Sequence, residues 1–219
     1  YSGTLFTMRA KLVTALAEKP ASADALKKSI LETLGKSLKG APEMTAELTA
    51  ALTKLLSSGA AGSVLPIAAQ WDKAGALKGA MASLIKDLFA KLQQAGASDD
   101  DRLGAAQTLI GLRNANDGAL PAVFAAITGD ASPTLKARLI TALGETGDAT
   151  VGTAIATGYS KLPAEAQTIA FNTLLKRADW SLAFLDAIKA KTVDPAVLGP
   201  ANAFRLRTHP DKAVSKRAG

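Results

Sequence analysis

The hydrophobic positions in the second half of the chain repeat every 31 residues. In each repeat an apolar residue is followed three positions later by a leucine, and five positions after that by an aspartate. The two apolar rows are Leu109, Leu112, Ile140, Leu143, Phe171 and Leu174. A helix–turn–helix unit of about 30–45 residues cannot bury its apolar stripe alone, so such units stack on one another. The pattern predicts an all-α fold, a right-handed α-solenoid with these six residues in its core.

The acids at the same phase of the repeat are Asp117, Asp148 and Asp179. Each follows a short turn, at the point where the next helix is expected to begin. A side-chain oxygen there can accept hydrogen bonds from the free backbone N–H groups of the first helical turn. We therefore predict that the three aspartates are structural helix caps, because a catalytic carboxylate has no reason to recur once in each unit.

Helical periodicity also runs through the first half, with less regular spacing. Helices are predicted over 4–18, from a cap at Ser22 or Asp24 as far as Leu38, and over 43–57, 64–71 and 75–94. The last of these helices carries the widest apolar stripe. A stripe of that width predicts that the helix is packed on both sides.

From residue 99 onward the predicted helices are regular. They lie near 100–112, 118–128, 133–144, 148–160, 163–176, 179–190 and 200–207, which makes roughly six helical pairs in the whole chain. Between the last two, the segment 193–200 contains two prolines and is predicted to be extended. A further repeat is expected to open at Asp211.

We predict one domain over residues 1–219, in three parts. Residues 1–95 hold the less regular helices, and residues 96–190 hold the regular repeats. Residues 191–219 hold the extended loop, the final helix and the start of another, truncated repeat.

Composition agrees with helices: 48% of the 219 residues are hydrophobic and only 5% are aromatic. No apolar run reaches the roughly 18 residues that a membrane-spanning helix needs, and the first residues do not have the pattern of a signal peptide. The segment has no cysteine, which excludes disulfides, thiolate metal sites and covalent haem attachment within it. Because it begins at Tyr1 without a methionine, we expect a piece of a longer protein or a processed chain.

The net charge of +7 is concentrated at the two ends. Residues 1–40 and residues 203–219 each carry a surplus of four positive charges, whereas residues 41–202 are nearly neutral. A solenoid that binds a nucleic-acid duplex needs basic side chains along several consecutive repeats, since affinity follows the number of phosphates neutralised. The distribution therefore argues against a nucleic-acid partner.

The segment His209-Pro210-Asp211-Lys212 matches the tetrapeptide of the J-domain co-chaperones. In a J-domain this tetrapeptide joins two antiparallel helices, and only seven residues follow Lys212 in this chain. We interpret the segment as a turn between repeats. His209 is the only histidine, so a zinc site at this position would have no companion His or Cys ligand.

Three other local patterns are interpreted as structural. Asp99-Asp100-Asp101 suits the first turn of a helix, where acids interact favourably with the helix dipole. The segment 114–118 is interpreted as a turn, because a calcium loop in that register would place Arg113 at a ligand position. No Gly-rich phosphate loop and no nucleophile elbow are present. The sequence therefore predicts no catalytic, cofactor-binding or metal-binding residue in this segment.

Several stretches of the second half resemble one family. They are Arg177-Ala178-Asp179-Trp180-Ser181-Leu182-Ala183-Phe184-Leu185-Asp186-Ala187-Ile188, Val193 to Ala201, and Leu206 to Val214, with a less specific likeness at 63–71 and 101–103. Together they are similar to the HEAT-repeat region of the large planctomycete and verrucomicrobial haem-binding proteins, often labelled membrane-bound dehydrogenases. The likeness covers about half of the chain well.

In that family a β-propeller resembling sugar dehydrogenases precedes the helical repeats, and a cytochrome c domain with a Cys-x-x-Cys-His motif follows them. The resemblance implies that this segment is a non-catalytic scaffold that links an oxidising module to a haem module. It also implies protein partners and a periplasmic or otherwise extracytoplasmic location. No cofactor is expected in the segment itself, since haem c would belong to a C-terminal domain of the parent protein.

Two other functions remain open from sequence. One is an independent protein-binding or peptide-binding HEAT solenoid, which needs an exposed apolar or charged stripe on its binding face. The other is a HEAT-like DNA glycosylase, which would use an aspartate with tryptophans in a basic groove. Trp71 and Asp72 are the pair that such an enzyme would use first.

Overall fold

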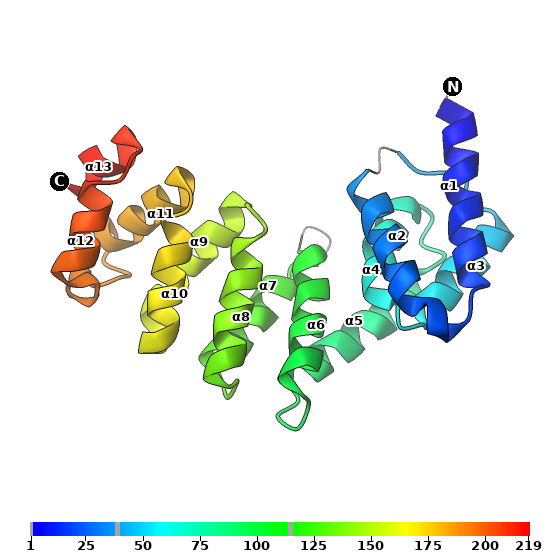
Figure 1. Cartoon of the computed structure of the whole chain (residues 1–219), viewed down its shortest axis with the longest axis horizontal. Coiled ribbons are helices and arrows are strands. Elements are labelled where there is room, and N and C mark those ends of the chain that lie inside the picture. The colour runs from blue at the N-terminus through cyan, green and yellow to red at the C-terminus, as the bar shows by residue number, and fades with distance from the viewer. Residues whose placement is uncertain (1, 38–39, 114–115) are drawn as a thin grey trace. The chain divides into compact units, whose positions relative to one another are not determined.

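The computed structural model describes residues 2–37, 40–113 and 116–219. Within these ranges the chain forms thirteen α-helices and three short 3₁₀ turns, and no β-strand (Figure 1). The predicted all-α class is therefore confirmed. Leu38, at the end of the second predicted helix, and Asn114-Ala115, in the turn before Asp117, lie outside the described residues.

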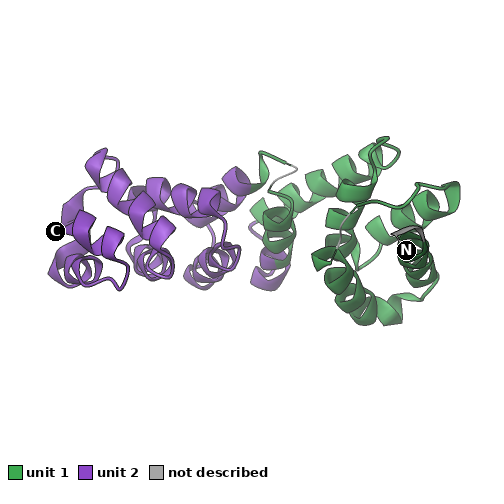
Figure 2. Ribbon diagram, turned by 90° about the horizontal axis from the view of Figure 1, so that it is seen from above, with its two compact units in different colours: residues 1–94, 104–119 green, residues 95–103, 120–219 purple. Residues whose placement is uncertain are grey.

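The helices group into two compact units (Figure 2). Unit 1 comprises Tyr1–Gln94 and Gly104–Ala119, and unit 2 comprises Ala95–Leu103 and Leu120–Gly219. The first change of unit, after residue 94, falls where the sequence predicts a change from less regular to regular helices. The single domain over residues 1–219 stays a prediction.

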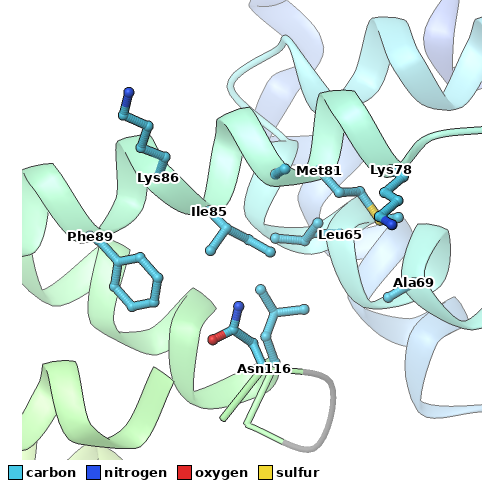
Figure 3. Close-up of a pocket in the computed structure, with 10 residues that line it drawn as sticks. Leu65, Ala69, Lys78, Met81, Ile85, Lys86, Phe89 and Asn116 are labelled. Carbon is cyan, nitrogen blue, oxygen red and sulfur yellow. The ribbon is translucent and has the colours of Figure 1, made fainter. Parts of the chain in front are cut away.

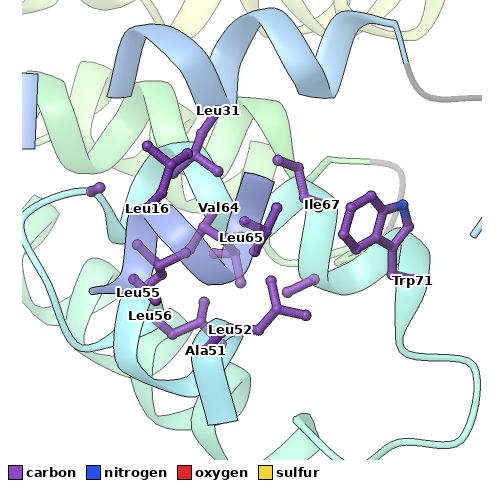
Figure 4. Packing of buried hydrophobic residues seen from close by; sticks show 14 of the residues in the cluster. Leu16, Leu31, Ala51, Leu52, Leu55, Leu56, Val64, Leu65, Ile67 and Trp71 are labelled. Atoms are coloured by element: carbon purple, nitrogen blue, oxygen red, sulfur yellow. The ribbon is translucent and has the colours of Figure 1, made fainter. Parts of the chain in front are cut away.

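Unit 1 is built mainly from the first five helices. They are α1 (Ser2–Ala17), α2 (Asp24–Lys36, after a 3₁₀ turn at Ala21–Ala23), α3 (Ala46–Leu56), α4 (Ala61–Trp71) and α5 (Lys78–Gln93). Helix α1 packs on α3, α2 packs on α4, and both α3 and α4 contact α5. Their shared core is made of leucine, isoleucine and valine side chains around α3 and α4, with Trp71 at one end (Figure 4).

Local chemistry sets the boundaries of these helices. The Thr45 side chain accepts a hydrogen bond from the Leu48 N–H group at 3.2 Å and so caps α3. After α4, the carboxylate of Asp72 accepts from the N–H groups of Ala76 and Leu77 at 2.8 and 2.7 Å. Asp72 thus organises the turn into α5.

Helix α6 (Asp99–Gly111) contributes residues to both units, since the division falls between Leu103 and Gly104. The predicted role of its acidic start is confirmed, because Asp99, Asp100 and Asp101 form its first turn. Two of these acids bind residues of α8 or its cap within unit 2. Asp99 accepts a hydrogen bond from the Ser132 hydroxyl, and Asp100 forms an ion pair with Arg138.

Unit 2 contains the regular helices. They are α7 (Ala119–Thr128), α8 (Pro133–Gly144), α9 (Ala149–Gly158), α10 (Ala164–Leu174), α11 (Ala178–Lys189), α12 (Gly199–Arg207) and α13 (Lys212–Ala218). Alternate helices pack against each other: α8 on α10, α9 on α11, and α11 on α13. The six predicted core residues at 109, 112, 140, 143, 171 and 174 are all buried, as predicted.

The three repeated aspartates have different roles. Asp148 caps α9 as predicted, because its carboxylate accepts from the N–H group of Thr150 at 2.9 Å. The prediction that Asp179 is a cap is wrong, because α11 begins one residue earlier, at Ala178, and Asp179 lies inside the first turn, paired with Arg177 at 3.1 Å.

Asp117 also does not lie at the cap position that was predicted for it. Helix α7 begins at Ala119, so Gly118 is the residue directly before it and Asp117 is exposed one position earlier. The turn is made by Asn116 instead, whose side-chain oxygen accepts from the Gly118 N–H group at 3.0 Å.

The segment 193–200, predicted to be extended, is instead mostly helical. Pro195–Leu198 forms a 3₁₀ turn and α12 begins at Gly199. Pro195 fits the first position of such a turn because its fixed φ angle is already helical and it needs no N–H partner there. Asp194 caps the turn through the Ala196 N–H group at 2.8 Å, and each of the two prolines lies at the start of a helical element.

Candidate functional site

An apolar groove lies beside α5 in unit 1. Its lining includes two buried leucines, Leu65 of α4 and Leu112 directly after α6, which we call its floor. Met81, Ile85 and Phe89 of α5 form the side that we call its wall (Figure 3). Its volume is about 440 Å³. This volume and this apolar lining fall in the range of about 300–1,000 Å³ that is usual for small-molecule sites.

The wall of the groove comes from helical spacing. Met81, Ile85 and Phe89 are four residues apart, so they lie along one side of α5. Each is only half-buried, whereas the one fully buried residue among those described in α5 is Leu92. Helix α5 contacts α3 and α4, and its packing on both sides stays a prediction, since the middle of its apolar stripe borders the groove.

Two cations stand at the edge of the groove. Lys78 and Lys86 both lie on α5, and both are exposed. Figure 3 shows the Lys78 side chain beside Met81 at one end, whereas Lys86 extends away from the groove. No acidic residue is among the described side chains that line the groove, so the charged groups in its lining are both cationic.

A second apolar surface lies on α1. Leu5, Met8 and Leu12 follow one another at intervals of three and four residues, and they are 49%, 64% and 40% exposed. Side chains at this spacing share one face of a helix. Helix α1 therefore presents an apolar stripe that no described part of the chain covers, with Arg9 on the same helix.

A smaller basic hollow of about 340 Å³ lies within unit 2, among α11, α12 and α13. It is lined by Ile188, Leu198 and Leu206, together with Arg207 and Arg217. One of its cations is already neutralised, because Arg217 forms an ion pair with Asp186. This hollow is thus less available to an anion than the edge of the α5 groove.

Polar contacts in unit 2 connect positions about one repeat apart. The Trp180 indole N–H donates to the Asp148 carbonyl at 3.1 Å, and the Ser160 hydroxyl donates to the Thr192 carbonyl at 3.0 Å. Each of these two bonds spans 32 residues. The Arg205 guanidinium donates to the Asn172 side-chain oxygen at 2.9 Å, across 33 residues. Side chains of unit 2 therefore bind residues that lie 32 or 33 positions away in the sequence.

An aromatic cluster fills the centre of the same unit. Phe184 packs edge-on against Tyr159 and Phe171, with ring centroids 4.8 and 5.9 Å apart. Such edge-to-face pairs are stabilising beyond the area that they bury. Burial raises the pKa of the Tyr159 hydroxyl above its usual value of 10.0. Its role is core packing, since its ring is enclosed.

The sequence candidates for chemistry are used structurally. Trp71 is 1% exposed, and both carboxylate oxygens of Asp72 accept backbone N–H groups, so the pair does not form an accessible site. His209 receives the Asp211 N–H group at Nδ1, at 3.0 Å, which leaves Nε2 to contact the Leu175 carbonyl at 3.3 Å. Asp211 caps α13. The tetrapeptide is a turn between helices, as interpreted from the sequence.

Two further properties of the described residues bear on the predictions. Among them, no three His, Cys, Asp or Glu side chains lie close enough to form a metal site. None of the described helices is long and apolar enough to cross a membrane.

Sequence reasoning missed the groove. The signal was present in the width of the apolar stripe on α5, which exceeds what one neighbouring helix can cover. It was interpreted as packing on two sides, and a sequence pattern cannot distinguish a covered stripe from a grooved one.

Comparison with known proteins identifies no relative. No family model, no curated protein and no solved structure matches this chain.

Proposed function

We propose that this chain is a non-catalytic helical scaffold that binds protein, built as a right-handed α-solenoid of HEAT-like repeats. The observation that carries the proposal is the set of hydrogen bonds in unit 2 that span 31 to 34 residues, about the length of one 31-residue sequence repeat. Packing of alternate helices, such as α8 on α10 and α9 on α11, supports the same arrangement. Stacked repeats of this kind present extended surfaces on which partners dock.

The exposed stripe of α1 is the surface that we assign to a protein partner. Leu5, Met8 and Leu12 form a continuous apolar row with large exposed fractions. Isolated exposed apolar residues are common, but a contiguous row of three marks an interaction surface. A partner helix with apolar residues at the same spacing would bury this row.

The family resemblance extends the proposal to a parent protein. We propose that the segment belongs to a larger, extracytoplasmic haem-containing protein similar to membrane-bound dehydrogenases, where it links a propeller module to a cytochrome c module. The support is the likeness of residues 177–188, 193–201 and 206–214. The four surplus positive charges at each end would meet those neighbouring modules.

The test is to isolate the intact protein from its source, without proteolysis, and to measure its mass and its absorption spectrum. A protein much larger than 22.4 kDa with a Soret band is expected. A haem-free protein of about the mass of this chain would contradict the redox parent and favour the independent protein-binding solenoid, a function that the α1 stripe also supports.

The glycosylase alternative lacks support. It requires an accessible aspartate beside an exposed aromatic ring, and base flipping needs both groups to reach the extruded nucleotide. The buried indole of Trp71 and the fully engaged carboxylate of Asp72 meet neither requirement.

A further inference from the structure

We propose that the groove beside α5 binds a single aliphatic chain that ends in an anionic group, such as a long-chain carboxylate. The scaffold proposal assigns no role to this groove, and the present proposal does not depend on that scaffold. The groove has about 440 Å³ of space, a floor of Leu65 and Leu112, and a wall of Met81, Ile85 and Phe89. Transfer of an aliphatic chain from water to such a lining is favourable by about 0.8 kcal/mol per buried CH₂ group.

The α5 side chains of the groove wall are only half-exposed, which favours a thin chain over a helix as its occupant. Met81, Ile85 and Phe89 are half-buried by their neighbours, and none of them is among the strongly exposed large hydrophobic residues of the chain. On α1, in contrast, Met8 is 64% exposed, as expected for a face that accepts a bulky partner. A helix with its side chains is about 10–12 Å wide, and it needs a face of the α1 kind. A slot between half-covered side chains admits a thinner ligand.

The length of the groove also suits a chain. Its wall follows α5 from Lys78 to Phe89. At a rise of about 1.5 Å per residue, this distance is about 16 Å. An extended aliphatic chain can lie along this wall with its apolar length covered on the floor side by α4 and by Leu112.

Charge selects the end group of the ligand. The charged residues that line the groove are two lysines, and the Lys78 side chain lies beside Met81 where the groove ends (Figure 3). The Asn116 amide lies at the opposite side of the floor, and its oxygen is occupied by the Gly118 N–H group, so its NH₂ group is the part left to donate. A carboxylate or another anion at the Lys78 end is complementary to this arrangement, whereas a cationic amphiphile is not.

The same charges disfavour the exposed apolar residues of α1 and α12 as occupants. The exposed apolar stripe of α1 is accompanied by Arg9 and Lys11, so α1 of a second copy would bring positive charge to a positive groove. Helix α12, with exposed Phe204, ends in Arg205 and Arg207. Neither of these two surfaces carries the anionic group that the Lys78 end would bind.

The three methionines of the chain can report where a ligand binds. Met81 lines the groove, Met44 packs at the edge of the unit 1 core, and Met8 is on the exposed α1 stripe. With ¹³C-labelled methionine methyl groups, the full chain is titrated with dodecanoate below its micelle concentration. A saturable shift of the Met81 signal, with the Met8 signal unchanged, is expected. Equal shifts of Met8 and Met81 would show adsorption to exposed apolar surface and overturn the proposal.

Charge reversal tests the end group. Lys78 is exposed, so Lys78→Glu leaves the core intact. It should weaken dodecanoate binding by about fivefold, the upper range of one exposed charge pair, and should improve binding of dodecyltrimethylammonium. The matched control is Lys73→Glu, an exposed lysine in the turn before α5 that does not line the groove. Equal effects of the two variants, or equal binding of the two amphiphiles to the unmodified chain, would overturn the assignment.

A peptide probe tests whether the groove binds an amphipathic helix instead of an aliphatic chain. An amphipathic helix of leucine and glutamate, about 14 residues or four turns long, is titrated in the same way. If this peptide shifts Met81 and dodecanoate does not, the groove is a helix-docking surface and the proposed ligand is wrong. If dodecanoate shifts Met81 and the peptide shifts only Met8, the groove binds the aliphatic chain and the α1 stripe binds helices, as proposed.

Discussion

Gly152 lies directly against the indole ring of Trp180. A Cβ atom at position 152 would come within 2.2 Å of Trp180 Cδ1 and within 2.6 Å of its Nε1. The indole is fully buried, and its N–H group donates to the carbonyl of Asp148 one repeat earlier. The missing side chain of α9 is therefore what lets α11 approach closely enough to make this bond.

Gly152→Ala should destabilise unit 2. The added methyl group would force the Trp180 ring away from the Asp148 carbonyl, and overpacking of this kind costs about 1–3 kcal/mol. Gly104→Ala is the matched control, because Gly104 is in helix α6 and a Cβ atom added there would meet nothing within 4 Å. That change should stabilise the chain by about 0.5–1 kcal/mol through helix propensity. Urea denaturation followed by circular dichroism compares them, and a stabilising Gly152→Ala would contradict the close packing.

Leu143→Ala should cost about 2–5 kcal/mol, as for other buried leucines. Leu143 is fully buried in α8, whereas Thr141 on the same helix is exposed. Thr141→Ala should therefore change the free energy of unfolding by no more than about 0.5 kcal/mol. Fluorescence of Trp180 in a Trp71→Phe background reports on unit 2. An unchanged denaturation midpoint for Leu143→Ala would contradict the repeat register.

Asp148 and Asp179 occupy different positions in their helices, so replacing each by alanine should lower stability by different amounts. Asp148→Ala loses a cap that bonds both the N–H group and the hydroxyl of Thr150, and should cost about 1 kcal/mol. Asp179→Ala loses an exposed pair with Arg177 and should cost less, about 0–1 kcal/mol. Both are measured by chemical denaturation, and a larger cost at Asp179 would show that it caps α11 after all.

The two tryptophans should respond differently to replacement by phenylalanine. The Trp180 N–H group donates to Asp148, and Arg177 lies 5.7 Å from the centre of the Trp180 ring, so Trp180→Phe loses both contacts. The Trp71 Nε1 atom has no hydrogen-bond partner in the part of the chain that the structure describes. Trp71→Phe removes a buried N–H group that has no hydrogen bond to lose. It should therefore lower the free energy of unfolding less than Trp180→Phe does. The expected difference is about 1 kcal/mol, the net contribution of one hydrogen bond. The reverse order in denaturation would contradict these environments.

Tyr159 should make stability depend on alkaline pH. Burial raises its pKa in the folded state above 10.0, so the unfolded state loses its proton first as the pH rises. The contribution of Tyr159 is fully present below pH 10 and is lost as the pH rises toward the folded-state pKa. Tyr1→Phe leaves Tyr159 as the one tyrosine of the chain. Its tyrosinate absorbance should then rise at a higher pH in the folded protein than in urea, and coincident curves would contradict the burial.

The sequence predicted the helices and the core of unit 2 well, for a physical reason. Residues such as Ile140 and Phe171 are buried by their own repeat and its neighbour, so their period alone reports their burial. The identity of the capping residue was less predictable, because a shift of one residue in a helix start moves Asp179 from the cap into the first turn. The Asp148 cap was predicted correctly, since its helix starts at the expected place.

The groove could not be predicted, because it depends on what does not pack beside α5. Periodicity assigned Met81 and Ile85 to a wide apolar stripe, but the width of a stripe does not show whether a neighbouring element covers it. The two lysines likewise gave no signal, since exposed lysines are usual on any helix. Whether half-buried side chains line a groove is visible only in three dimensions.

The 31- to 34-residue reach of the bonds within unit 2 has a consequence for how this part of the chain folds. Each bond closes a loop of one repeat, and the entropy lost in closing a loop grows with its length. No strand pairing between distant segments has to be found before such contacts form. We therefore expect unit 2 to begin folding at any adjacent pair of repeats and to grow outward from there, as local contacts favour fast folding.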